Sequence, residues 1–194
     1  MSAWRSTVFK NRGSLLALPA VALAVLGKPS RASIAAGVPL ALAGEALRCW
    51  AVGYSGVTTR SDRVTAPRLT TAGPYAYVRN PLYVGNFITA LGFTVAFTGA
   101  VPPRRRAWLA LAGLGTMLAV YAAIVPLEEA YLRETFGADF DAYCAVVPRV
   151  IPRTTPAEPQ RGEYDAGVIA GAESRTFATF AAMLAALGVQ AAVA

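Results

Sequence analysis

Apolar runs almost free of charge alternate along this chain with short polar segments, a pattern that predicts membrane-spanning helices. A helix needs about 20 apolar residues to cross the hydrocarbon core of a bilayer. Five runs approach or reach that length: residues 13–27, 32–54, 82–101, 107–127 and 176–194. We therefore predict an all-α integral membrane helix bundle with about five transmembrane helices and short cytoplasmic helices.

The first run, residues 13–27, has two interpretations. At ~1.5 Å per residue it is roughly 22 Å long, short of a ~30 Å hydrocarbon core. A basic start followed by a short apolar run is typical of a signal peptide. The run also fits a first span whose flanking Lys28 and Arg31 extend toward the headgroups. Because further spans follow, we favour the span.

The second run carries Glu45 and Arg48, which are three residues apart and hence on one face of a helix. One interpretation is an ion pair within the helix that faces the bundle. The other is a polar contact that faces a functional site, since ionisable residues at membrane depth are costly and often functional. We favour the ion pair.

Residues 73–85, which read GPYAYVRNPLYVG, form a first polar segment between apolar runs. Pro67 and Pro74 exclude one continuous helix through the loop before it. Asn80 and Pro81 are suited to the cap and the first position of the next helix. The N–H groups at such a helix start favour a carboxylate.

Residues 128–153 form a second polar segment, one apolar run later. Residues 129–144 have amphipathic helical spacing, and Gly137 divides them into two short helices. The proline-rich residues 148–159 predict an extended coil, and residues 160–174 are compatible with a short helix. We expect the two polar segments to meet at one membrane face.

Composition supports the membrane interpretation. The chain is 55% hydrophobic and 15% charged, with a mean hydropathy of +0.44, whereas soluble domains have about 25% charged residues. The net charge of +7 does not indicate nucleic acid, because the basic residues separate apolar runs and form no stripe. With no His and two distant Cys residues, the sequence supports neither an imidazole-based site nor a metal site.

Charge counts predict the topology. With the N-terminus inside, the inside segments carry 12 Lys and Arg residues and the outside loops carry 5. This excess predicts that both polar segments face the cytoplasm. The outside cluster Arg104-Arg105-Arg106 runs against the rule.

The segments GPYAYVRNPLYVG and EEAYLRETFGADFDAYCAVVPRVIP resemble the isoprenylcysteine carboxyl methyltransferase family, within a wider group that includes phospholipid N-methyltransferases. The resemblance covers about residues 68–152, nearly half of the chain. Glu173-Ser174-Arg175-Thr176 before an apolar run resembles bacterial members. The resemblance thus implies a bacterial inner-membrane enzyme with a cytoplasmic pocket for S-adenosylmethionine and a lipid-like acceptor that enters from the bilayer.

The resemblance implies one membrane-embedded domain over residues 1–194. It would comprise an N-terminal hairpin (13–54), a cofactor-binding catalytic core (68–153) and a C-terminal helix (176–194). By position, the implied cofactor contacts are Arg68, Leu69, Thr70, Tyr75, Asn80, Pro81, Leu82, Tyr83 and Glu128. Glu128 and Arg79 are the predicted catalytic residues, and the guanidinium chemistry of Arg79 suits a clamp for the cofactor carboxylate or an acceptor headgroup.

Several of these residues have plainer interpretations. Tyr75 and Tyr83 could stack on adenine or belong to the aromatic belt at the membrane interface. Arg79 could be an interface residue, and Glu129 fits a surface pair with an arginine. Arg149 and Arg153 flank the proline-rich coil and are weak candidates for covering the pocket.

Two departures from the family pattern bear on the chemistry. The family commonly has His where this chain has Asn80, which keeps a hydrogen-bond donor and acceptor but cannot become cationic. Eukaryotic members place an Arg about one turn before the acidic pair, near Ile124 here, and this chain has none there. That absence argues against an isoprenylated cysteine as acceptor.

A carboxylate acceptor is a nucleophile at neutral pH and needs no base, which suits a chain without His. We therefore favour methyl transfer to a lipid carboxylate, as in isoprenylcysteine O-methylation. The alternatives are phospholipid N-methylation, in which Glu128 or Glu129 would take a proton, and a reductase with a nicotinamide cofactor, because steroid reductases have a similar C-terminal region. A non-catalytic membrane protein on this scaffold is a further alternative.

Overall fold

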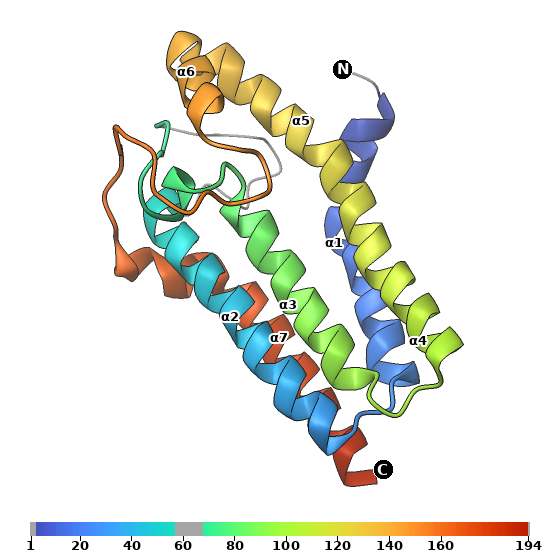
Figure 1. Cartoon of the computed structure of the whole chain (residues 1–194). Coiled ribbons are helices and arrows are strands. Elements are labelled where there is room, and N and C mark those ends of the chain that lie inside the picture. The colour runs from blue at the N-terminus through green and yellow to red at the C-terminus, as the bar shows by residue number, and fades with distance from the viewer. Residues whose placement is uncertain (1–2, 57–67, 194) are drawn as a thin grey trace. The chain divides into compact units, whose positions relative to one another are not determined.

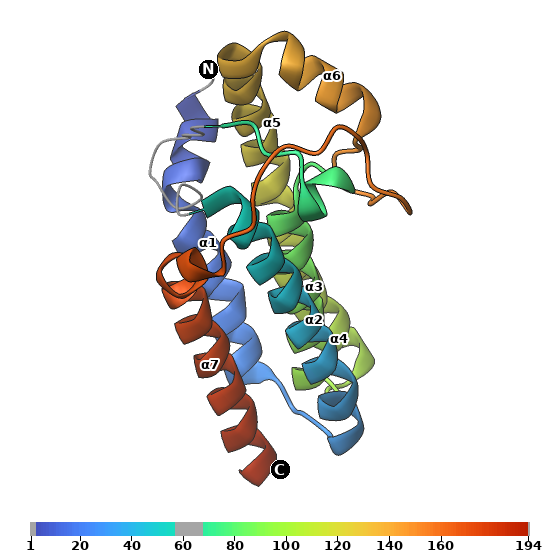
Figure 2. The same cartoon turned by 90° about the vertical axis from the view of Figure 1, so that its left-hand side faces the viewer.

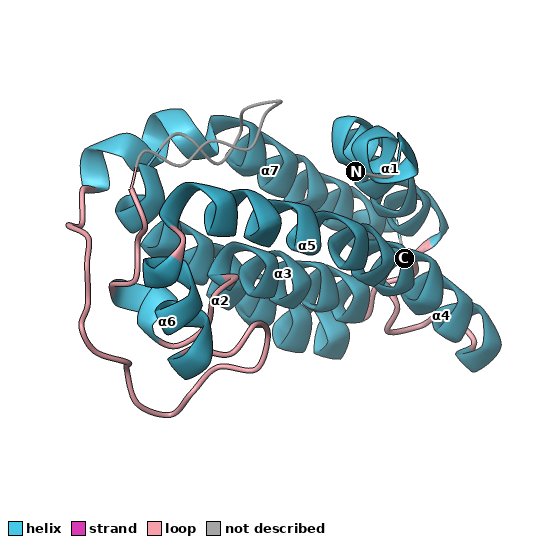
Figure 3. Ribbon diagram, turned by 90° about the horizontal axis from the view of Figure 1, so that it is seen from above, coloured by secondary structure: helices cyan, strands magenta, loops and turns pink. Residues whose placement is uncertain are grey.

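The computed structural model describes residues 3–56 and 68–193, and the regular elements in these ranges are helical (Figure 3). Figure 1 shows them in chain order. The main helices are α1 (Ala3–Leu26), α2 (Arg31–Ser55), α3 (Pro81–Phe97), α4 (Pro103–Ala110), α5 (Thr116–Phe136), α6 (Ala138–Val146) and α7 (Ile169–Val193). The short elements are the 3-10 turns η2 (Gly73–Ala76) and η4 (Ala166–Val168) and the π-helical turn η3 (Leu111–Gly115). Pro67, in the loop before the first polar segment, lies outside the described residues.

Among the described residues, four helices are long and apolar enough to cross a membrane. They are Thr7–Leu26, Arg31–Ser55, Pro103–Phe136 and Ala166–Val193. The prediction of an all-α integral membrane helix bundle is confirmed. The span predicted over residues 82–101 corresponds to α3, a shorter apolar helix of 17 residues that ends at Phe97.

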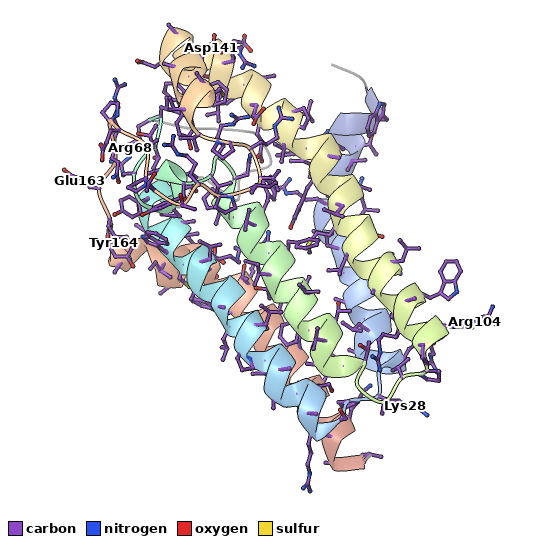
Figure 4. All side chains as sticks on the ribbon, in the orientation of Figure 1. Lys28, Arg68, Arg104, Asp141, Glu163 and Tyr164 are labelled. Carbon is purple, nitrogen blue, oxygen red and sulfur yellow. The ribbon has the colours of Figure 1, made fainter. Side chains whose placement is uncertain are left out.

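The early end of α3 coincides with a contact to a residue that is distant in the sequence. The carbonyl of Phe97 accepts a hydrogen bond from the backbone N–H of Lys28 (2.7 Å), and the N–H of Ala100 donates to the carbonyl of Lys28 (2.8 Å). These bonds bring together the connections that follow α1 and α3 and turn the chain out of the helix. Figure 4 accordingly shows Lys28 and Arg104 at the same end of the helices.

The fourth apolar run, predicted over residues 107–127, is part of a longer helix. Pro103 begins a helix that continues through α4, η3 and α5 to Phe136, with Pro126 inside it. The arginine cluster therefore lies in the first turn of α4 and not in a loop. The predicted division at Gly137 is confirmed: this glycine has φ +51° and separates α5 from α6. Residues 169–174 begin α7, which therefore starts earlier than expected.

The chain consists of two compact units. Unit 1 comprises Met1–Glu45, Asn86–Ile124 and Thr176–Ala194, and unit 2 comprises Ala46–Gly85 and Val125–Arg175. The single domain over the whole chain stays a prediction.

Helices α2 and α3 pack unusually closely in unit 1. A Cβ atom on Gly92 would lie 2.3 Å from the backbone nitrogen of Ala41, and one on Gly37 would lie 2.4 Å from that of Ala96. The hydroxyl of Ser33 donates to the carbonyl of Ala96 (2.8 Å) at the same contact. Small residues that let backbones approach are typical of helix contacts in membranes. The α2–α3 pair is thus antiparallel and tightly fitted.

Unit 2 has its own small core on α6. Phe140, Tyr143, Val147 and Ala157 are buried together. Leu69, Leu132, Phe136 and Cys144 pack against them. The amphipathic spacing predicted for residues 129–144 is thereby confirmed, and it places the end of α5 and all of α6 under the proline-rich coil.

The close α2–α3 contact predicts opposite effects for one substitution at two glycines. Gly92→Ala places a methyl group against backbone atoms of α2 and should lower the midpoint of thermal unfolding in detergent, at a cost of about 1–3 kcal/mol. The exposed Gly188 of α7 has no atom near its missing Cβ. Gly188→Ala should leave the midpoint unchanged or raise it, since Ala favours a helix by up to ~1 kcal/mol. Equal midpoints for the two variants would contradict the close packing.

Candidate functional site

The first polar segment folds as the sequence predicts around Asn80. Helix α3 begins at Pro81, and the carbonyl of Asn80 accepts the N–H groups of Tyr83 and Val84 (both 3.1 Å). The side-chain amide of Asn80 donates to the carbonyl of Arg149 (3.0 Å). The start of α3 is thus joined directly to the second polar segment.

Glu129 is the buried carboxylate that links both polar segments. It lies in α5 and is 6% exposed. Its Oε1 accepts from Nε of Arg79 (3.1 Å) and from Nε of Arg149 (3.0 Å), and its Oε2 accepts from Nη2 of Arg149. A carboxylate removed from water is costly unless it is paired and hydrogen-bonded. Two guanidinium groups supply that pairing here.

Arg79 also caps the C-terminal end of helix α6. Its Nη1 donates to the carbonyls of Val147 (2.7 Å) and Cys144 (3.1 Å). The last carbonyls of a helix have no partner within the helix, and a cation there is favourable. Arg79 therefore positions α5, α6 and the first polar segment relative to one another. The guanidinium group of Arg79 is thus engaged by Glu129 and by these two carbonyls.

The proline-rich coil lies along the first polar segment, as Figures 1 and 2 both show for the orange coil and the green turn η2. Backbone N–H groups of Arg79, Arg153 and Ala157 donate across the contact to the carbonyls of Pro148 (2.9 Å), Tyr77 (3.0 Å) and Ala76 (2.9 Å), respectively. The prediction of an extended coil over residues 148–159 is confirmed. These bonds satisfy backbone N–H and C=O groups of a segment that belongs to no helix or strand.

Thr71 continues this contact beyond the coil. Its N–H donates to the carbonyl of Arg161 (2.8 Å), and its hydroxyl donates to the carbonyl of Pro159 (3.1 Å) and accepts from the N–H of Arg161 (2.8 Å). The predicted cofactor contacts Arg68, Leu69 and Thr70 do not include this threonine. A lone threonine in a loop carries no pattern that could have identified it.

Glu128 and Tyr83 form the most direct side-chain contact between the predicted cofactor residues. The hydroxyl of Tyr83 donates to Oε1 of Glu128 at 2.7 Å. Tyr83 lies in the first turn of α3, and Glu128 lies on α5 one residue before the buried Glu129. Tyr75 is close enough for the charge of Glu128 to affect its hydroxyl. The structure thus brings Tyr75, Tyr83 and Glu128 together.

The remaining predicted residues have the following places. Pro81 is buried, and Leu82 is half-buried on α3. Leu69 packs on the α6 core, Thr70 lies beside Gly162, and the exposed Arg68 contacts the carbonyl of Tyr54 at 3.5 Å. These positions lie on unit 2 along with Glu128.

Arg48 has a partner on α7, at a distance in sequence that no local pattern predicts. Its Nη2 donates to both carboxylate oxygens of Glu173 on α7 (2.8 and 2.6 Å). Both residues are buried, with Glu173 fully so. Breaking such a pair costs more than its formation contributes, because a buried charge is left behind. The pair therefore holds α7 to α2 within unit 2. The resemblance of Glu173-Ser174-Arg175-Thr176 to bacterial members pointed to this region of the chain. It did not predict the ion pair between Glu173 and Arg48.

An aromatic contact supports the same junction. The rings of Tyr54 and Tyr164 have centroids 5.4 Å apart, and the N–H of Asp165 donates to the carbonyl of Gly53 (2.8 Å). Figure 4 shows Tyr164 at the end of α2. A side chain on Gly53 would overlap this ring. Glycine at position 53 thus allows the observed approach of the Tyr164 ring.

Burial keeps the phenols and the thiol of this region neutral. It raises the pKa of the Tyr75 hydroxyl to about 12, and the charge of Glu128 adds to this, while a hydrogen bond with Ser55 and the charge of Arg48 oppose it. Burial also raises the pKa values of Tyr143 and Cys144. The hydrogen bond to Glu129 raises the pKa of Arg149. None of these groups is a base at neutral pH, so Glu128 and Glu129 are the acceptors of interest.

In the part of the chain that the structure describes, no group of three or more His, Cys, Asp or Glu side chains is placed to hold a metal ion.

The fold and this site define an all-helical membrane protein in which two polar segments meet at the start of helix α3. Residues 32–139 match the model of the family described as phospholipid methyltransferase. Because this match covers more than half of the chain, the protein belongs to the phospholipid methyltransferase family. The recognition made from the two polar segments is confirmed at this level.

One similar protein is the protein-S-isoprenylcysteine O-methyltransferase of Schizosaccharomyces pombe. It is 37% identical over 84 residues, which are 43% of this chain and 33% of the relative. The chain thus matches about a third of that relative's length. No solved structure gives a significant match.

The charge network around Glu129 predicts a stability effect. Glu129→Gln removes the negative charge between Arg79 and Arg149 and should lower stability by roughly 3 kcal/mol, since breaking a buried pair costs about that much. The matched control is Asp141→Asn, because the Arg133–Asp141 pair is more than half exposed and such pairs contribute about 0–1 kcal/mol. Thermal unfolding in detergent measures both, and equal midpoints would show that Glu129 does not hold the segments together.

Proposed function

We propose that this protein is an S-adenosylmethionine-dependent methyltransferase of the membrane, with a lipid-like acceptor. The observation that carries the proposal is the Tyr83–Glu128 hydrogen bond, which joins the two segments that resemble the family. The family match covers Tyr83, Glu128 and all the other predicted site residues. The name of the S. pombe relative supports a carboxylate as the methyl acceptor.

The residues at this site fit S-adenosylmethionine by their chemistry. A half-buried carboxylate such as Glu128 can accept hydrogen bonds from ribose hydroxyls or an ammonium group. Tyr75 and Tyr83 offer aromatic faces, and Asn80 offers an amide at the start of α3. Because Arg79 is occupied by Glu129 and two carbonyls, we assign it a positioning role in place of direct contact.

The cofactor would supply a methyl group already activated by its sulfonium charge. The protein then has to orient the acceptor and exclude water, which are effects of positioning and desolvation. An acceptor carboxylate displaces the sulfur with its own oxygen lone pair and needs no base. An acceptor amine must first lose a proton, and Glu128 is the nearby group that can take it.

We further propose that unit 2 faces the cytoplasm of a bacterial inner membrane. The excess of Lys and Arg in the predicted inside segments supports this orientation. The five Lys and Arg residues in the predicted outside loops run against this orientation.

The proposal is tested by incubating the purified protein in lipid vesicles with S-adenosylmethionine that carries a labelled methyl group. We expect label in the lipid fraction, reduced at least about tenfold by Glu128→Gln, since a hydrogen bond to a charged group contributes about 1.5–3 kcal/mol. The control Glu134→Gln changes an exposed acid on the same helix and should keep full activity.

Treatment of the labelled lipid with base identifies the bond that was formed. A methyl ester releases its label as methanol, whereas an N-methyl group retains it. Volatile label supports the carboxylate acceptor, and stable label supports phospholipid N-methylation. Lipid without label under all conditions would contradict the methyltransferase proposal.

A further inference from the structure

Five exposed cations gather at one end of unit 1. They lie between the end of α1 and the first residue of α2, and in the first turn of α4. They are Lys28, Arg31, Arg104, Arg105 and Arg106. The hydrogen bonds of the Lys28 backbone to Phe97 and Ala100 hold the two connections together. Figure 4 shows Lys28 and Arg104 at this end of the helices.

The positive charge at this end is not balanced by acidic side chains of unit 1. Among the residues of this unit, the sequence has one acidic side chain, that of Glu45. Glu45 follows Arg31 on α2 at a distance of roughly 21 Å along the helix axis, at 1.5 Å per residue. That distance is too great for an ion pair between the two side chains. The balancing charge must therefore come from outside unit 1.

Helix stability does not account for the arginines of α4. The first turn of this helix contains three arginines and no acid. The start of a helix carries a partial positive charge, so cations there are unfavourable. Arg106 has a structural role, because its Nη2 donates to the carbonyls of Gly99 (2.9 Å) and Val101 (3.3 Å). Arg104 and Arg105 therefore need another explanation.

The exposed surface of unit 1 changes from apolar to charged at this level. On α1, the exposed Val25 and Leu26 come just before Lys28. On α4, the exposed Trp108 comes just after Arg106. Both helices belong to segments long and apolar enough to cross a membrane, and tryptophan is enriched where such segments meet the headgroups. The five cations therefore lie at the depth of the lipid headgroups.

We propose that this end of unit 1 binds an anionic phospholipid, with the headgroup phosphate at Arg104 and Arg105 and the acyl chains beside Trp108. A guanidinium group matches a phosphate in charge and can donate two parallel hydrogen bonds to it. A lipid without net charge is a poorer partner, because the choline of phosphatidylcholine cancels the charge of its phosphate. The proposal does not rest on the proposed methyl transfer, since it concerns a surface of unit 1 and its test measures lipid binding.

The test uses the fluorescence of Trp108, which a brominated lipid quenches on contact. The full-length protein with Trp4→Phe and Trp50→Phe keeps Trp108 as its one tryptophan. It is placed in phosphatidylcholine vesicles with a minor fraction of phosphatidylglycerol. The bromine is carried either by the phosphatidylglycerol or by an equal amount of the phosphatidylcholine. We expect phosphatidylglycerol to associate with Trp108 at least about fivefold more strongly, which corresponds to about 1 kcal/mol.

One pair of variants separates these arginines from the charge of the whole protein. Arg104→Gln combined with Arg105→Gln should bring the two lipids to within about twofold of equal association. It should leave the midpoint of thermal unfolding unchanged or raise it, because cations at a helix start are unfavourable. The control combines Arg5→Gln with Lys10→Gln, which removes the same charge from the first part of α1 and should keep the preference.

A second measurement keeps the natural tryptophans. Native mass spectrometry counts the lipids that the protein retains from nanodiscs with equal amounts of phosphatidylglycerol and phosphatidylcholine. We expect more phosphatidylglycerol, and loss of that difference with Arg104→Gln and Arg105→Gln. Equal binding of the two lipids, or a preference that persists without the two arginines, would overturn the proposal. Either result leaves the proposed methyltransferase activity untouched, and absence of that activity would leave the lipid site untouched.

Discussion

The buried carboxylate of Glu129 is the constraint on which the arrangement of unit 2 depends. A charge at this depth must be matched, and it is matched by Arg79 from the first polar segment and Arg149 from the second. Arg79 in turn satisfies the carbonyls at the end of α6. One acidic side chain thereby fixes the start of α3, the end of α5, α6 and the proline-rich coil.

The pairing of Glu129 also positions the neighbouring Glu128. Since Glu129 holds α5 against the first polar segment, the preceding residue is brought to the hydroxyl of Tyr83. The two neighbouring acids thus have different partners: Glu129 pairs with Arg79 and Arg149, and Glu128 accepts a hydrogen bond from Tyr83. A site without His or an ionised phenol suits methyl transfer, because an activated methyl group requires little acid–base chemistry.

Local patterns predicted much of the fold, and their failures have physical causes. The apolar runs, the Asn80-Pro81 helix start, the Gly137 break and the coil follow from residue properties that act over a few positions. The end of α3 was missed because it depends on Lys28, 69 residues away. The continuation of α5 past residue 127 was missed because the apolar run ends there while the helix does not. The Arg48–Glu173 and Arg79–Glu129 pairs join distant residues, and no local spacing encodes them.

The central claim is that Tyr83 and Glu128 act together on one ligand, and a double-mutant cycle tests it most directly. The affinity for S-adenosylmethionine is measured by titration calorimetry on the full-length protein and on Tyr83→Phe, Glu128→Gln and the double variant. The account predicts that both single variants bind more weakly and that the double variant binds no more weakly than Glu128→Gln, a coupling of about 0.5–3 kcal/mol. Additive losses, or native affinity in all variants, would contradict it.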